Sequence, residues 1–270
     1  MEIGKSFLIQ HFMDTLWMIR PDSLRNMTEV LLKKASEGYG GSFDLLQAEP
    51  KADKAGLVQR VGSVAILNVE GVMVPKASWL DSLCGFTSTI ELHNQFNILV
   101  NDPSVQRIVL YFDSPGGSST AIFEFAESVF NARSIKEIVS FTDTCMCSAA
   151  AAVGFAADQV VATPSATIGS IGTYITLIKD KPESQDYDIH FIQAGDNKLF
   201  GSPSVPLSND EVSFFKDMVD KHYELFTSNI AKFRNVTQDE VKATKASFYG
   251  ASEAPEWMYD ALADSNYVLS

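Results

Sequence analysis

The feature that most constrains the fold is a regular alternation of short β-rich runs with longer helical stretches after residue 61. Apolar, β-branched runs cover 63–74, 107–112, 137–141 and 159–163, and helical periodicity covers 89–100 and 119–132 between them. Strands that alternate with helices in this way build βαβ units, whose strands lie parallel in one sheet. We therefore predict an α/β fold with a mostly parallel sheet.

The second half of the sequence predicts two further strands followed by two helices. Apolar runs at 171–178 and 188–193 are expected as strands. A capping box from Ser208 to Glu211 then introduces a long helix over 209–234, and a second box, from Thr237 to Glu240, opens a shorter one. One face of the long helix is expected to be buried because apolar residues recur at helical spacing, namely Val212, Phe215, Val219, Phe226, Ile230 and Phe233.

The N-terminal region has a different character from the rest of the chain. Residues 1–36 are predicted to form two amphipathic helices, with the first ending at Pro21, and are interpreted as a helical appendage. Residues 37–60 lose periodicity and gather Gly, Pro and charge, which is typical of a linker. The compact domain is expected to span 61–270. The first residues lack the basic, apolar and small-residue segments of a signal peptide.

Composition narrows the function classes. The 270 residues carry a formal net charge of −13, which argues against a nucleic-acid partner because phosphate binding requires a basic surface. The longest mainly apolar run, 145–157, is too short to span a bilayer. Three cysteines, Cys84, Cys145 and Cys147, form an odd set without metal-type spacing, which indicates free thiols in a reducing compartment. We expect a protein of the cytoplasm or of the inside of a particle.

Two strand-to-helix junctions carry the residues that could do chemistry. The first, "DSPGG" at 113–117, exposes backbone N–H groups that can stabilise an oxyanion, although a plain glycine turn explains the same residues. A phosphate loop is less favoured because no Gly-Lys-Ser/Thr follows. At the second junction Ser148 opens an Ala-rich helix, either as an N-cap or as a nucleophile. Neighbouring parallel strands would bring both junctions to one sheet edge.

A nucleophilic serine needs a base, and the histidines give no recognisable triad context. His11, His93, His190 and His222 stand outside any Gly-x-Ser-x-Gly pattern. A neutral lysine can replace histidine as the base. Lys198 is a candidate because it lies in a glycine-flanked loop after an expected strand, although most lysines are simply solvated surface charges.

These motifs together resemble the signal peptide peptidase A family of serine peptidases. The resemblance is strongest to the family's phage branch, the prohead proteases of lambda-like phages. The resemblance covers about residues 61–260. It rests on "VEGVM" (69–73), "DSPGG", the block "CSAAAAVGFAADQVVATPSATIGSIGTY" (147–174), "AGDNK" (194–198) before "PLSNDE", and the long helix ending "AKFRN". The stretch "WMIRPDSL" near the N-terminus also resembles the phage branch.

The resemblance implies a ClpP/crotonase-like βαβ superhelix and assigns site residues. Ser148 would be the nucleophile and Lys198 its general base. Gly116, Gly117 and the N–H of Ala149 would form the oxyanion hole, while Gly169, Ser170, Ile171 and Gly172 would line the site. The family has a glycine after the serine, whereas this chain has alanines at 149 and 150. Backbone N–H donation survives that change.

The resemblance also implies partners and a place of action. The expected function is serine endopeptidase cleavage of phage scaffold or capsid proteins during head maturation, by a homo-oligomer whose dyad can be completed between subunits. Neither a metal nor an organic cofactor is expected, and charge and run length speak against nucleic acid and a membrane span. The resemblance implies the host cytoplasm or the phage prohead as the location. Two alternatives stay open: a crotonase-like acyl-thioester-binding enzyme using carboxylates such as Asp113 and Asp143, and a catalytically silent structural subunit of a head assembly.

Overall fold

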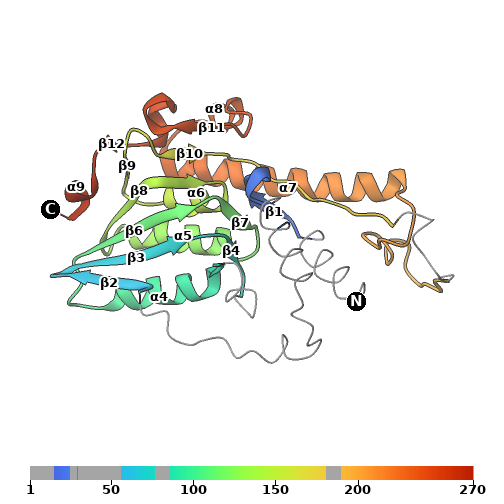
Figure 1. Cartoon of the computed structure of the whole chain (residues 1–270), viewed down its shortest axis with the longest axis horizontal. Coiled ribbons are helices and arrows are strands. Elements are labelled where there is room, and N and C mark those ends of the chain that lie inside the picture. The colour runs from blue at the N-terminus through green and yellow to red at the C-terminus, as the bar shows by residue number, and fades with distance from the viewer. Residues whose placement is uncertain (1–14, 25–28, 30–55, 77–84, 181–189, 270) are drawn as a thin grey trace.

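The computed structural model describes residues 15–24, 29, 56–76, 85–180 and 190–269, which form an α/β fold around a mostly parallel sheet (Figure 1). The strands of the large sheet lie in the order β11-β10-β8-β6-β3-β2, with β9 paired to β8. The pairs β3·β6, β6·β8, β8·β9 and β8·β10 are parallel, while β2 and β11 add antiparallel edges. The predicted fold class is therefore confirmed by the topology.

The bounds of the strands follow the apolar runs of the sequence. The large sheet contains β2 (Val58–Val61), β3 (Val64–Glu70), β6 (Arg107–Ser114), β8 (Glu137–Cys147), β9 (Gln159–Ala162), β10 (Thr167–Gly169), β11 (Phe248–Gly250) and β12 (Ala261–Leu262), the last of which pairs with β9. A second, small sheet has the order β1-β7-β4-β5 and contains β1 (Trp17–Ile19), β4 (Met73–Val74), β5 (Thr87–Ser88) and β7 (Gly116–Ser118).

Helices cover the large sheet on the face that holds the main core. They are α4 (Thr89–Asn101), α5 (Ile122–Ala132), α6 (Ala149–Gly154), α7 (Asn209–Arg234) and α8 (Gln238–Ala243), and α9 (Ser265–Leu269) packs on the opposite face through Val268. Two short 3₁₀ turns, η3 (Ala251–Glu253) and η4 (Glu256–Met258), lie in the C-terminal region. α5 buries Ile122, Phe125, Ala126 and Val129, the spacing of one helical face.

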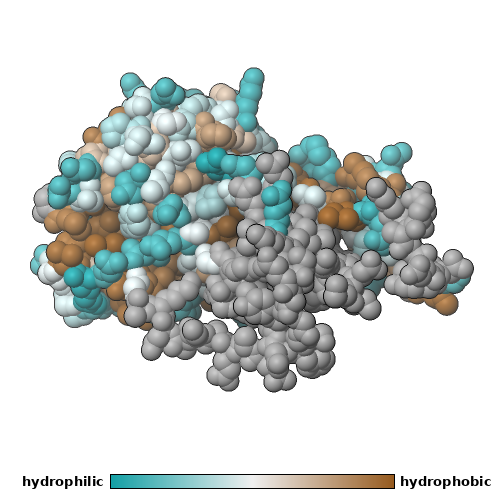
Figure 2. All heavy atoms as spheres, in the orientation of Figure 1, coloured by the Kyte–Doolittle hydropathy of each residue, from teal (hydrophilic) through white to brown (hydrophobic). Residues whose placement is uncertain are grey.

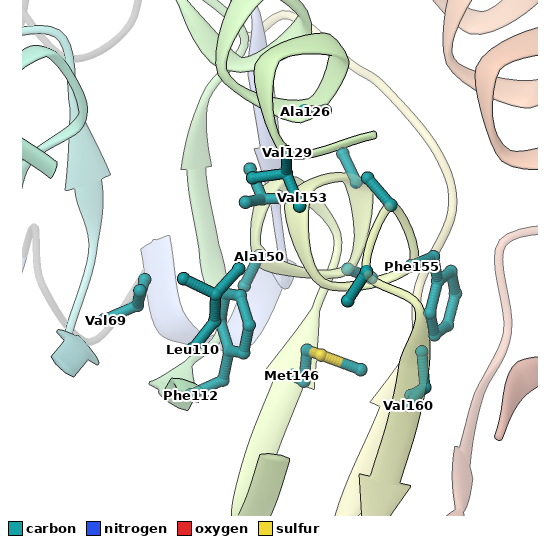
Figure 3. Close-up of a cluster of buried hydrophobic side chains, with 14 of the residues drawn as sticks. Val69, Leu110, Phe112, Ala126, Val129, Met146, Ala150, Val153, Phe155 and Val160 are labelled. Carbon is teal, nitrogen blue, oxygen red and sulfur yellow. The ribbon is translucent and has the colours of Figure 1, made fainter. Parts of the chain in front are cut away.

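The alanines of α6 allow this helix to lie close to the sheet. Figure 3 shows Ala150 and Val153 of α6 between α5, represented by Val129, and the sheet residues Phe112 and Met146. A Cβ on Gly154 would clash with the sulfur of Met146, so the helix end also requires a small residue. Small side chains therefore allow α6, which begins directly after Ser148, to pack closely between the sheet and α5.

The long helix α7 has the predicted bounds but only half of the predicted burial. Phe226, Ile230 and Phe233 are buried, and the Phe233 ring lies 4.9 Å from that of Phe130. Val212, in contrast, is 46% exposed, which contradicts the expectation for the first turns. The N-terminal half of α7 extends past the sheet as an arm (Figure 1). Figure 2 shows hydrophobic surface on this arm, where the exposed large apolar residues are Val212 and Phe214.

Two other expectations need correction. The helix expected before Pro21 is wrong for Trp17–Ile19, which form the buried strand β1, because β1 pairs antiparallel with β7. The strand expected over 171–178 is reduced to one isolated bridge at Tyr174, and 190–193 are irregular. Residues 1–14, 188–189, Cys84 and most of the predicted linker lie outside the described residues. The division into appendage, linker and domain stays a prediction.

Candidate active site

Ser148 has an unusual backbone conformation at the turn between β8 and α6. Its φ is 57° and its ψ is −114°, so it lies at positive φ and also away from the left-handed helical minimum. Its N–H donates to the Gly169 carbonyl at 2.8 Å, and its carbonyl accepts the N–H of Ala152 at 2.9 Å. Parallel pairing of Cys147 with Gly169 brings these groups together. The pairing therefore forces the turn, at a cost of about 1–3 kcal/mol for such a conformation.

The Ser148 side chain has no structural partner. The residue is only 1% exposed, and its hydroxyl oxygen forms no hydrogen bond with any described residue. The side-chain N-cap, which was the alternative role for this serine, is not formed. A buried hydroxyl without a partner costs about 1–3 kcal/mol. Two unfavourable features thus coincide on one residue, a pattern typical of functional sites.

The glycine junction lies directly beside Ser148. Gly116 has a φ of 108°, and a Cβ built on it would lie 2.9 Å from the Ser148 Cβ and 3.0 Å from the Ala149 nitrogen. The structure therefore brings together three of the predicted site residues, and the close approach explains why only glycine fits at 116. The N–H of Gly116 donates to the Ser114 hydroxyl at 3.3 Å. Gly117 is also sterically required, since a Cβ there would clash with the Met73 carbonyl.

The segment 169–172 lies on the other side of Ser148. Gly169 accepts the Ser148 N–H, as described above, and Ser170 has a φ of 58° and donates its N–H to Ser247. Ile171 is buried, and Gly172 lies so close to Ala246 that a Cβ would be 2.6 Å from the alanine side chain. Gly169 is thus in direct contact with Ser148, while 170–172 continue along the same edge.

Lys198 is not brought to Ser148 within the chain. It lies exposed in a turn where its N–H donates to the Gly195 carbonyl at 3.1 Å. The Ser148 hydroxyl has no hydrogen-bond partner among the described residues, so neither Lys198 nor His93, His190 or His222 reaches it. His222 instead contacts the Met218 carbonyl through Nδ1.

An ion pair anchors the segment around Lys198 to α7. Glu211 is 1% exposed, and its carboxylate accepts from the Lys179 Nζ and the Gly201 N–H, both at 2.7 Å. Burial opposes its charge, but the Lys179 hydrogen bond, the Gly201 N–H and the Lys179 charge hold the pKa of Glu211 below its ordinary value. Glu211 therefore ties Lys179 and Gly201, which lie on either side of the Lys198 turn in the sequence, to the first turn of α7.

Two thiols and one arginine adjoin the nucleophile position. A hydrogen bond from the Cys147 thiol lowers the pKa of Cys145 despite burial, and the Arg20 charge acts in the same direction. The same bond, together with burial, raises the pKa of Cys147. Cys147 is buried and Cys145 half-buried, as expected for packing residues. The sequence alone did not identify Arg20 as a neighbour of this site, because Arg20 directly follows β1 and belongs to no recognised motif.

The carboxylates of the acyl-thioester alternative are engaged elsewhere. Asp113 accepts from the Thr144 hydroxyl at 2.8 Å, and Asp143 accepts from the Tyr111 hydroxyl at 2.8 Å. Burial and then the Asp143 hydrogen bond raise the pKa of Tyr111 to about 12. Among the described residues no cluster of three or more His, Cys, Asp or Glu side chains is arranged to hold a metal ion. No helix in the described ranges is both long and apolar enough to cross a membrane.

Fold and site together define an α/β protein with a serine held at a strained strand-to-helix turn beside backbone N–H groups. The model of peptidase family S49 matches residues 131–268, and the chain belongs to this family. The match includes Ser148, Lys198 and the segment 169–172. It confirms the family expected from the sequence motifs.

Individual relatives are similar over most of this chain. Capsid assembly protease C of Escherichia phage lambda is 26% identical over 215 residues, which is 78% of this chain and 49% of the relative. Head-tail preconnector protein GP5 of Enterobacteria phage P21 is 24% identical over 213 residues, 78% of this chain and 42% of the relative. The chain thus spans about half the length, or less, of these curated relatives. Among solved structures, a mutant of ClpP1 from Listeria monocytogenes has a TM-score of 0.47 at 12% identity, covering 76% of this chain and 94% of that chain.

Proposed function

We propose that the chain is a serine endopeptidase in which Ser148 is the nucleophile. The observation that carries this proposal is the buried, unpartnered Ser148 hydroxyl beside Gly116 and the Ala149 N–H. No packing or capping role accounts for a hydroxyl in that state. Family membership supports the same reaction class.

The reaction would proceed through an acyl-enzyme. The Ser148 oxygen attacks the carbonyl carbon of the scissile peptide bond while its proton passes to the base, and the proton then goes to the leaving amine. The N–H of Ala149 and the N–H groups of the Gly116–Gly117 turn are proposed to stabilise the oxyanion, with a rearrangement freeing Gly116 from Ser114. One such donor is worth about 10²–10³ in kcat. Water then hydrolyses the ester.

We propose that Lys198 is the base and that a second copy of the chain supplies it. Lys198 is exposed, and within one chain nothing among the described residues bonds to the Ser148 hydroxyl. The arm next to it carries the exposed apolar side chains of Val212 and Phe214, which contact between copies would cover. Removal from water at such a contact favours the neutral amine that a base requires.

The proposed substrates are scaffold or capsid proteins of a phage head, cleaved in the host cytoplasm or inside the immature head. The support is the similarity to a relative named as a capsid assembly protease and to one named as a head-tail preconnector protein. Because this chain spans half of those relatives or less, the substrates are a proposal for this chain.

A mixing experiment tests the base and its origin together. Ser148→Ala and Lys198→Ala are purified separately, combined at increasing ratios, and assayed for cleavage of an unfolded protein substrate. Each variant alone is expected to be inactive, and the mixture is expected to regain activity because one copy gives Ser148 and the other Lys198. Lys221→Ala is the matched control and should retain full activity, because Lys221 is an exposed lysine on α7 that pairs with Asp217. Full activity of Lys198→Ala alone would refute its role. An inactive mixture whose copies have exchanged would place the base within one chain.

A further inference from the structure

The strand β1 lies beside Ser148, between β7 and Tyr174. It is hydrogen-bonded on both sides, to β7 on one and to Tyr174 on the other (Figure 1). Trp17 and Tyr174 exchange two backbone hydrogen bonds of 2.9 and 3.0 Å. On the β7 side, the Ser119 N–H donates to the Leu16 carbonyl at 3.0 Å, and the Arg20 N–H donates to the Pro115 carbonyl at 3.2 Å. An extended segment held by main-chain bonds in this way is bound as a peptide ligand is bound by strand addition.

The register of β1 places one peptide bond at the nucleophile. Met18 pairs with Gly117. A Cβ built on Gly116 would clash with the Met18 carbonyl oxygen, and the same point lies 2.9 Å from the Ser148 Cβ and 3.0 Å from the Ala149 nitrogen. The Met18 carbonyl therefore points to the place where Ser148 and the proposed oxyanion donors meet.

The side chains of β1 are all buried. Met18 is 0% exposed and belongs to the main core together with residues of α6, while Trp17 and Ile19 pack with Phe86 in a separate apolar cluster. Beyond them the Arg20 guanidinium lies 4.5 Å from the centre of the Phe248 ring and pairs with Asp22 at 2.7 Å. An unbranched apolar side chain, that of Met18, is thus buried at the carbonyl proposed to react, and the contacts of Arg20 anchor the strand on the C-terminal side.

We propose that the Met18–Ile19 peptide bond is a self-cleavage site, and that β1 excludes other substrates until this bond is cut. The proposal rests on the proposed function. The Ser148 oxygen bonds to the Met18 carbonyl carbon, the bond to the Ile19 nitrogen breaks, and the base returns the proton to the Ile19 amine. Water then hydrolyses the ester, which leaves Met18 as a carboxylate and releases everything before Ile19 once its strand contacts open.

The test measures the N-terminus of the assembled full chain by intact-mass spectrometry and terminal sequencing over time. The wild type is expected to convert to a chain that begins at Ile19, and Ser148→Ala is expected to stay intact. Met18→Leu, which keeps an apolar side chain of similar size, should be cut at the same bond. Met18→Asp, which would bury a charge, should be cut at least tenfold more slowly.

A synthetic peptide covering residues 14–23 separates this inference from the proposed function. Cleavage of the peptide between its Met and Ile by the wild type, together with conversion of the chain, supports the inference. Cleavage of the peptide while the chain stays intact overturns self-cleavage and leaves the peptidase standing. If neither is cut and Ser148 does not react with a fluorophosphonate, the proposed function fails and the inference falls with it.

Discussion

Replacing Ser148 should make the protein more stable, and the size of the gain follows from the structure. The buried hydroxyl without a partner costs about 1–3 kcal/mol, so Ser148→Ala is expected to raise the free energy of unfolding by about 1–2 kcal/mol. Ser148→Gly also relieves the positive-φ strain of about 1–3 kcal/mol. The greater conformational freedom of glycine in the unfolded chain offsets up to about 1 kcal/mol of that gain. Both variants should lose peptidase activity, as expected where function and stability conflict.

The matched control is Ser140, another fully buried serine, whose hydroxyl donates to the Gly154 carbonyl at 2.8 Å. Ser140→Ala removes that hydrogen bond, although the Gly154 carbonyl keeps the Ala157 N–H at 3.3 Å, and should destabilise the protein by about 0.5–1.5 kcal/mol. Thermal unfolding at one fixed protein concentration reads both effects when each substitution is made in the Lys198→Ala background, which is expected to stay uncut at Met18–Ile19. The expected scale is about 2–4 °C of Tm per kcal/mol for a chain of this size. If Ser148→Ala lowers Tm as Ser140→Ala does, the Ser148 hydroxyl forms a stabilising hydrogen bond and is not without a partner.

Three further outcomes are expected. Gly116→Ala should reduce peptidase activity at least about a hundredfold, because a methyl group there meets Ser148 and Ala149, and near-wild-type turnover would show that the junction adapts. Glu211→Gln should destabilise the protein by about 2–4 kcal/mol at pH 7. Because folding lowers the pKa of Glu211, this difference should begin to shrink as the pH falls below about 4 and should be lost below that lowered pKa. A difference that stays unchanged in acid would contradict the ion pair's role. Iodoacetamide should modify Cys145 before Cys147, as read by peptide mapping, because only the pKa of Cys145 is lowered. The Cys145 adduct should slow the reaction of Ser148, and an unchanged rate would show that the two do not share space.

The sequence predicted the elements whose ends are marked by residues within or next to the element. The long helix was predictable to the residue because Ser208 caps its start and Asn235, in the left-handed conformation, ends it. The meeting of the "DSPGG" turn with Ser148 was predictable from the parallel order of β6 and β8. The exposure of Val212 was not predictable, because the periodicity of a helix shows which face is apolar and not whether the rest of the chain covers it.

The placement of β1 depends on contacts that no local pattern contains. The run "LWMI" is short enough to suit either a helix or a strand, and its partners β7 and Tyr174 lie about 100 residues or more away. Pro21 gave a usable signal, since the residues before a proline favour extended backbone. The position of Lys198 relative to Ser148 was equally out of reach, because the family motif assigns a role and does not say which copy of the chain fulfils it.

The most direct test of the central claim is fluorophosphonate labelling of the assembled protein, incubated until its mass is constant and read by intact-mass spectrometry and peptide mapping. The wild type should gain one adduct on Ser148. Ser148→Ala should gain none, Lys198→Ala should react much more slowly, and Ser165→Ala, an exposed serine in the same block, should behave as wild type. An adduct that persists in Ser148→Ala, or a wild type that gains none, would contradict Ser148 as the nucleophile.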